Sequence, residues 1–140
     1  MKINLERKDD NYLFELTNSR GHKVILDNTS QENPQGVSPM ESLLMAMAGC
    51  SSIDMVSILK KQRQEITHFA AEVEGDRVQV NDAKPFRNIH VVFQLEGEID
   101  PKKALRAAEL SFEKYCSVSM TLDPQIKITW EVVVNGVKAA

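Results

Sequence analysis

The two cysteines, Cys50 and Cys116, are the side chains in this sequence best suited to covalent chemistry. A thiolate can attack an electrophile, and a second thiol can then close a disulfide on the oxidised sulfur. Free cysteines are also among the most buried residue types, so two inert core thiols are the alternative. The two cysteines lie far apart in the sequence, and their spacing alone favours the inert alternative.

Other kinds of reactive or metal-binding site have little support. His22, His68 and His90 fall in a turn or on expected strands, and none has a ligand-like spacing from a cysteine. A structural zinc site normally needs four ligands in compact pairs. The sequence has no glycine-rich phosphate loop and no Gly-x-Ser-x-Gly motif. We therefore expect neither a metal nor a cofactor.

A long apolar helix is predicted to position Cys50. Ser38, Pro39 and Glu41 form the start signal of a helix over residues 38–64, with Ser38 as the N-cap and Glu41 completing a capping box. The segment is apolar or small on nearly every face, which is typical of a helix buried on all sides. Its methionines are expected to pack in the core, although they could instead line a pocket for an apolar ligand: Met40, Met45, Met47 and Met55.

The flanking segments predict strands and one more helix. Short strands are expected over 2–8, 12–17 and 23–27, forming an antiparallel meander, followed by a polar loop over 28–37. After the long helix, alternating apolar residues predict a hairpin whose second strand contains the inward-facing residues Ile89, Val91, Phe93 and Leu95. Asp100 and Pro101 start an amphipathic helix that ends near Cys116, with Leu105, Ala108, Phe112 and Tyr115 as its apolar stripe. The last strand is expected over 126–134.

These elements predict a single α+β domain over residues 1–140, with antiparallel sheets around the long buried helix. A helix that is apolar on every face needs more cover than one small sheet provides, so we expect a homodimer rather than a monomer whose sheet wraps the helix.

Net charge and sequence pattern limit the expected binding partners and the expected cellular compartment. The net charge of −3 argues against nucleic-acid binding, because a nucleic-acid binder usually carries a basic patch. Glu41 and Asp54 interrupt the apolar helix, which argues against a membrane span. The N-terminus lacks a signal-peptide pattern, so we expect a cytoplasmic protein whose cysteines are free thiols or a catalytic pair.

The segment Ser38-Pro39-Met40-Glu41, the following Gly49-Cys50 and the segment Tyr115-Cys116-Ser117-Val118-Ser119 together resemble the OsmC/Ohr superfamily of thiol peroxidases. The resemblance is close to the YhfA-like branch and covers essentially the whole chain. It implies an intertwined homodimer with two active sites at the subunit interface. It also implies reduction of organic hydroperoxides, with Cys50 as the peroxidatic and Cys116 as the resolving residue. The reductant would be an external dithiol, such as a lipoylated protein.

The resemblance further implies an arginine from the N-terminal strands, held near the thiol by a glutamate at the start of the buried helix. The family's glutamate usually follows the proline directly, where this chain has Met40, and Glu41 comes next. Arg7 is the better candidate for the arginine and Arg20 the second. Both could instead be solvated surface charges.

Three functions follow from these observations. The first is a thiol-dependent hydroperoxide reductase that acts in the response to oxidative stress. The second is a binding module whose dimer pocket holds an apolar or acylated ligand, with the cysteines as sensor or core residues. The third is a redox-inert dimer with a structural role.

Overall fold

The computed structural model describes all 140 residues, and they form two compact units, Met1–Leu43 and Leu44–Ala140. The first unit contains a three-stranded antiparallel sheet of β1 (Ile3–Arg7), β2 (Phe14–Asn18) and β3 (Lys23–Leu26), in the order β1-β2-β3. This sheet is the meander that the turn residues predicted. The unit also contains the polar loop and the first turn of the long helix.

The long helix α1 (Pro39–Lys61) begins as the sequence predicted. The Ser38 backbone N–H donates to the Glu41 carboxylate at 2.7 Å, and the Glu41 N–H donates to Ser38 Oγ at 3.1 Å. These two bonds are the capping box, and the hydrogen bond from the Ser38 N–H lowers the pKa of Glu41. Lys60 and Lys61 lie in the last turn, where positive charge complements the helix dipole.

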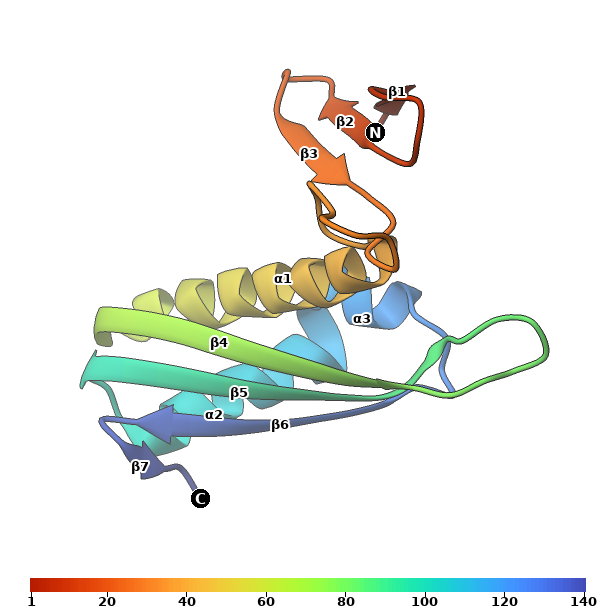
Figure 1. Cartoon of the computed structure of the whole chain (residues 1–140). Helices are drawn as coiled ribbons and strands as arrows, with labels where there is room; N and C mark the ends of the chain where they lie inside the picture. The colour runs from red at the N-terminus through yellow and green to blue at the C-terminus, as the bar shows by residue number, and fades with distance from the viewer. The chain divides into compact units, whose positions relative to one another are not determined.

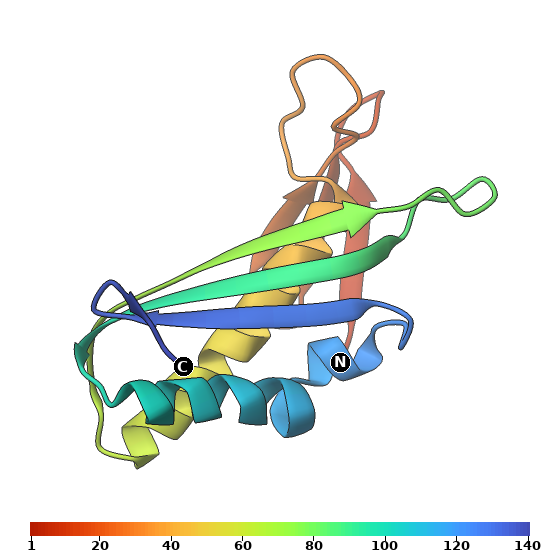
Figure 2. The same cartoon turned by 90° about the horizontal axis from the view of Figure 1, so that it is seen from below.

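The second unit is a four-stranded sheet with helices on one side (Figures 1 and 2). Its strands are β4 (Glu65–Arg77), β5 (Phe86–Glu98), β6 (Lys127–Val134) and the short β7 (Val137–Lys138), in that order across the sheet. Both α1 and α2 (Pro101–Leu110) lie on the same side of this sheet. After α2 come a π-helical turn, η1 (Ser111–Tyr115), and a short helix, α3 (Ser117–Thr121).

The sheet of the second unit is mixed: it contains one parallel pair, which the prediction of antiparallel sheets did not include. Strands β4 and β5 form the expected antiparallel hairpin, but β5 and β6 are parallel, with Asn88 opposite Lys127 and Leu95 opposite Val134. The chain leaves β5, passes through α2 and returns in the same direction, which is the crossover that parallel neighbours require. This crossover brings the chain segment between α2 and β6, which contains Cys116, back beside the sheet.

The core lies between the sheet and the helices. Ile89, Val91, Phe93 and Leu95 are buried along β5, as their alternation predicted. Phe93 lies in an aromatic cluster, with ring centroids 6.1 Å from Phe69 and 6.2 Å from Phe112. Phe112 in turn stacks on Trp130 at 4.8 Å. The cluster connects the centre of the sheet to the π-helical turn that precedes Cys116.

The buried faces of both helices differ from the predictions. In a single chain α1 is buried only along one stripe with a period of four, formed by Met47, Ser51, Met55 and Leu59, while Met45 and Ile53 are exposed. By length and composition this helix could cross a membrane, a property that it shares with core helices of globular proteins. On α2 the buried residues are Ala104, Ala107 and Ala108, and Tyr115 is exposed. The chain becomes π-helical after Leu110, which ends the α-helical period on which the stripe depended.

Gly97 allows a sharp irregularity at the end of the β4–β5 hairpin. Its φ is +136°, and a Cβ there would collide with the carbonyl oxygen of Glu65. The register of the hairpin shifts between Ile66 and His68, next to this contact. A residue with a side chain would be strained both in backbone conformation and in packing.

Candidate functional site

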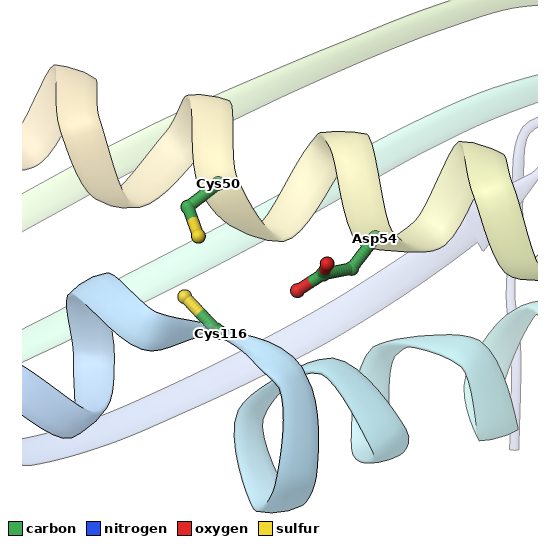
Figure 3. Close-up of side chains that lie close together, drawn as sticks. All are labelled: Cys50, Asp54 and Cys116. Atoms are coloured by element: carbon green, nitrogen blue, oxygen red, sulfur yellow. The ribbon is translucent and has the colours of Figure 1, made fainter.

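The site lies in the second unit, where α1 passes the turn between η1 and α3. Figure 3 shows three side chains that meet there: Cys50 and Asp54 from α1, and Cys116 from the turn. The two Sγ atoms and a carboxylate oxygen of Asp54 all lie within 4.8 Å of one another. Both cysteines are free thiols. The fold thus brings together the two sulfurs that the sequence alone could not place side by side.

Cys50 and Asp54 lie on the same face of α1 because residues four apart on a helix are neighbours. Cys50 is half-buried beside the buried stripe of the helix, and Asp54 is half-buried one turn later. The Asp54 carboxylate points toward both sulfurs (Figure 3). The middle of α1 therefore presents a thiol and a carboxylate in the same direction.

Cys116 is fully buried and is held by hydrogen bonds at its backbone and its sulfur. Its backbone N–H donates to the Ser111 carbonyl at 2.7 Å, which closes the π-helical turn. Its Sγ accepts a hydrogen bond of 3.5 Å from the backbone N–H of Ser119. Burial raises the pKa of the Cys116 thiol, and the neighbouring Cys50 raises it further, while Ser119 lowers it. At neutral pH Cys116 is therefore a protonated thiol.

Ser111 connects the carboxylate to the turn that carries Cys116. Its side chain is fully buried, and its Oγ donates to Asp54 Oδ2 at 2.9 Å. A hydrogen bond to a charged acceptor is stronger than one between neutral groups. The orientation of Asp54 is thus fixed by the residue that also bonds to the Cys116 backbone.

Asp54 also lines a pocket to which neither cysteine contributes. The pocket has a volume of about 340 Å³, and its other lining residues are Ser57, Ile58, Lys61, Gln62, Leu110 and Tyr115. The pocket combines apolar walls with one cation, Lys61. Gln62 Oε1 is buried there without a hydrogen-bond partner.

The sequence did not single out Asp54 and Ser111 as functional residues. Asp54 entered only as an interruption of an apolar helix, although its spacing of four from Cys50 was a usable signal. Ser111 had no signal, because its role depends on the π-helical turn and on contact between two elements far apart in the sequence. Cys50, Asp54 and Cys116 are three possible metal ligands, one fewer than in a structural zinc site, and no histidine belongs to the group.

The two other predicted site residues belong to the first unit. The Arg7 guanidinium donates from Nε to the Asn11 carbonyl at 2.9 Å, within the hairpin of β1 and β2. The Glu41 carboxylate bonds to the Ser38 N–H in the capping box. A role for Arg7 or Glu41 at the thiols stays a prediction.

A comparison of the sequence with models of protein families identifies the family of this chain. The model of the family described as OsmC-like protein matches residues 31–131. This chain is a member of the OsmC-like family. The match includes Cys50, Asp54, Ser111 and Cys116, so the site described above lies within the OsmC-like region of the chain.

Known proteins and solved structures are similar to this chain along most of its length. Protein YhfA of Escherichia coli K12 is 38% identical over 116 residues, which are 81% of this chain and 84% of YhfA. The crystal structure of a hypothetical protein from Aquifex aeolicus VF5 is 31% identical, with a TM-score of 0.81 and coverage of 96% of both chains. An organic hydroperoxide resistance protein from Elizabethkingia anophelis shares the fold, with a TM-score of 0.72 at 11% identity and coverage of 96% of this chain and 97% of that one.

Proposed function

We propose that this OsmC-like protein is a thiol-dependent peroxidase that reduces organic hydroperoxides through a disulfide between Cys50 and Cys116. The observation that carries the proposal is the position of the two free thiols within 4.8 Å of each other in this fold. The family includes proteins named for organic hydroperoxide resistance, such as the one from Elizabethkingia anophelis, which adds support for the substrate class. We assign the peroxidatic role to Cys50 because it is the less buried of the two thiols and therefore the more accessible to a hydroperoxide.

The reaction has three steps. The Cys50 thiolate attacks the outer oxygen of the hydroperoxide, the O–O bond breaks, and an alcohol leaves after protonation, so that Cys50 becomes a sulfenic acid. The Cys116 sulfur then attacks the Cys50 sulfur and displaces water, forming the disulfide. An external dithiol, such as a lipoylated protein, finally reduces the disulfide and is itself oxidised. No bound cofactor takes part in these steps.

The first step requires a thiolate at Cys50, and a free cysteine has a pKa of about 8.5. We propose Arg7 as the cation that favours the thiolate, with Glu41 as its partner and Arg20 as the second candidate. Met40 occupies the position directly after Pro39, so Glu41 is the nearest carboxylate at the start of the helix. Replacement of Arg7 by Met should slow Cys50 oxidation more than replacement of Arg20 by Met.

We also propose that the single domain 1–140 functions as a homodimer, in the cytoplasm, with its sites completed at the interface. In the single chain Met45 and Ile53 of α1 are 55% and 69% exposed, and a second copy would cover this apolar face. The solved relative from Aquifex aeolicus covers 96% of this chain, which supports one domain along its whole length. Sedimentation at micromolar concentration should give twice the chain mass.

Anaerobic thiol titration tests the peroxidase. Reduced protein is treated with a stoichiometric amount of cumene hydroperoxide, and the remaining thiols are counted. The wild type should lose both of its thiols per chain. The Cys116→Ser variant should lose its one thiol as a sulfenic acid that dimedone traps, and Cys50→Ser should keep its thiol. An unchanged thiol count in the wild type would refute the proposal.

A non-catalytic binding module is the second candidate function. The pocket of about 340 Å³ beside the site has apolar walls from Ile58, Leu110 and Tyr115 and could hold an apolar or acylated ligand. Native mass spectrometry of the purified protein distinguishes the two functions. A co-purified apolar ligand together with slow peroxide consumption would favour the binding module, with the cysteines as sensor or core residues.

A further inference from the structure

The formation of a disulfide requires a proton acceptor that the two thiols do not provide. Cys116 is fully buried, and burial raises the pKa of its thiol, so the attacking sulfur carries a proton at neutral pH. A thiol is a much weaker nucleophile than a thiolate. The Ser119 N–H, 3.5 Å from Sγ, can stabilise the thiolate once it forms but cannot remove the proton. The resolving sulfur therefore needs a base beside it.

Asp54 is the one carboxylate that meets both sulfurs. Its carboxylate oxygen lies within 4.8 Å of the Sγ atoms of Cys50 and Cys116 and points toward them (Figure 3). Proton transfer needs a separation near 3 Å or one bridging water, and catalytic contacts are often longer before the reactants are in place. A small rotation of the Cys116 side chain or one water would complete this path.

Ser111 keeps the carboxylate in place for this task. It donates to Oδ2 of Asp54 through its side chain and accepts from the Cys116 N–H through its carbonyl. One buried residue therefore links the position of the carboxylate to that of the Cys116 backbone.

Because Asp54 also lines the pocket of about 340 Å³, its carboxylate can exchange protons with water there. The titratable groups that face Asp54 are Cys50 on its own helix, Cys116 from the turn, and Lys61 and Tyr115 across the pocket. Lys61 and Tyr115 belong to the pocket and not to the group of Cys50, Asp54 and Cys116, so Asp54 is the one proton acceptor in that group besides the thiols.

We propose that Asp54 is the general base of the resolving step, accepting the Cys116 proton as that sulfur attacks Cys50. With a sulfenic acid at Cys50, the S–S bond forms as the S–O bond breaks, and Asp54 returns the proton to the departing hydroxide to give water. The Cys116 sulfur is oxidised and the Cys50 sulfur is reduced. The inference deepens the proposed function and depends on it for the identity of the oxidant, but the proton transfer itself requires only that the two thiols form a disulfide.

A peroxide-free assay separates this inference from the peroxidase. The reduced protein reacts with one equivalent of 4,4′-dithiodipyridine per chain, which gives a mixed disulfide at Cys50, releases a first thiopyridone and leaves no reagent for Cys116. Attack by Cys116 then releases a second thiopyridone and forms the protein disulfide. In Cys116→Ser only the first release occurs, which assigns the second phase to Cys116. The rate of the second phase therefore measures the resolving attack without any peroxide.

The decisive variant is Asp54→Asn, which keeps the size of the side chain and removes the base. Near pH 7 its second phase should be slower than in the wild type by about 10²-fold, the lower end of general-base effects. Its first phase should not slow, because loss of a negative charge next to Cys50 can only favour the thiolate. The two proteins should converge only as the pH rises toward the folded pKa of Cys116, which burial has raised above the ordinary thiol value, because hydroxide then ionises the thiol unaided. The control is Glu72→Gln, which removes an exposed carboxylate from β4 and should behave as the wild type at every pH.

Other roles of Asp54 predict different results. If the carboxylate only repels the thiolates, Asp54→Asn should accelerate both phases. If it only holds the turn in place, the second phase should slow by the same factor at every pH, and Ser111→Ala should slow it as much. Either result, or a second phase within about threefold of the wild type at pH 7, overturns the inference. Should Asp54→Asn fail to fold by circular dichroism, Asp54→Ser provides the same comparison. A wild type that forms the disulfide in this assay yet ignores hydroperoxides would refute the peroxidase alone.

Discussion

The hydrogen bond from Ser111 to Asp54 should contribute measurably to stability as well as to the site. Ser111 is fully buried and its Oγ lies 2.9 Å from Asp54 Oδ2. A hydrogen bond to a charged group contributes about 1.5–3 kcal/mol, and a buried polar group left without a partner costs about 1–3 kcal/mol. Ser111→Ala removes the donor from the carboxylate. Asp54→Ala leaves the buried Ser111 hydroxyl without its acceptor.

The double variant tests whether these two losses have one origin. Because it removes both partners together, its loss of unfolding free energy should be smaller than the sum of the two single losses by about 1.5 kcal/mol or more. Losses at independent sites add to within about 0.5 kcal/mol, so the expected coupling is well outside that range.

Urea unfolding followed by fluorescence provides the assay. Trp130 is the only tryptophan, and its ring stacks at 4.8 Å on Phe112, which directly follows Ser111, so the signal reports on this region. All four proteins are compared at one concentration and with reductant present, because dimer formation and a disulfide would each change the apparent stability. Additive losses would refute the reasoning, since they would mean that the two side chains do not share a hydrogen bond in solution.

Two further predictions concern the core and the buried thiol. Phe93→Ala removes a fully buried ring that contacts Phe69 and Phe112, so it should lower the free energy of unfolding in urea by about 3–5 kcal/mol. Phe93→Leu keeps most of the apolar volume and should lower it clearly less. Equal losses in the two variants would contradict the packing described. Because burial raises the pKa of Cys116, the unfolded chain gives up this proton at lower pH than the folded one, so the stability of the reduced protein should fall as the pH rises from about 8.5 toward the folded pKa. The unfolding free energy of Cys116→Ser, measured over the same pH range, should fall less than that of the wild type. If the two free energies fall with pH at the same slope, the Cys116 thiol is not responsible.

Local patterns in the sequence determined the elements that carry the thiols. The capping box of Ser38 and Glu41 located the start of α1, and Asp100 with Pro101 located the start of α2, because these signals depend on neighbours within one turn. The alternation along 89–95 predicted the inward face of β5 for the same reason. The positions of Cys50 on a long helix and of Cys116 at the end of the next helical segment followed from these elements.

The pairing of the last strand shows what local patterns left open: they predicted a strand over 126–134 but not which strand it pairs with or in which direction. The order strand, helix, strand over residues 86–134 is the order of a parallel crossover, and β5 and β6 are indeed parallel. One chain buries only one stripe of α1, so the predicted burial of this helix on all sides depends on the expected homodimer and stays a prediction. Composition indicates that an apolar surface is buried in the native protein, but it does not indicate whether the same chain or a second chain buries it.

By itself, the sequence determined that one thiol lies on a long helix and the other at the end of the next helical segment, and the resemblance of its motifs identified the family. Only the tertiary structure placed the sulfurs within 4.8 Å of each other with Asp54 beside them, and Ser111 between the carboxylate and the turn of Cys116. Contacts of this kind depend on a crossover and on a π-helical turn, which set the path of the chain over long distances. The periodicity of one helix predicts which of its side chains share a face, but the partner that faces them is chosen by the fold.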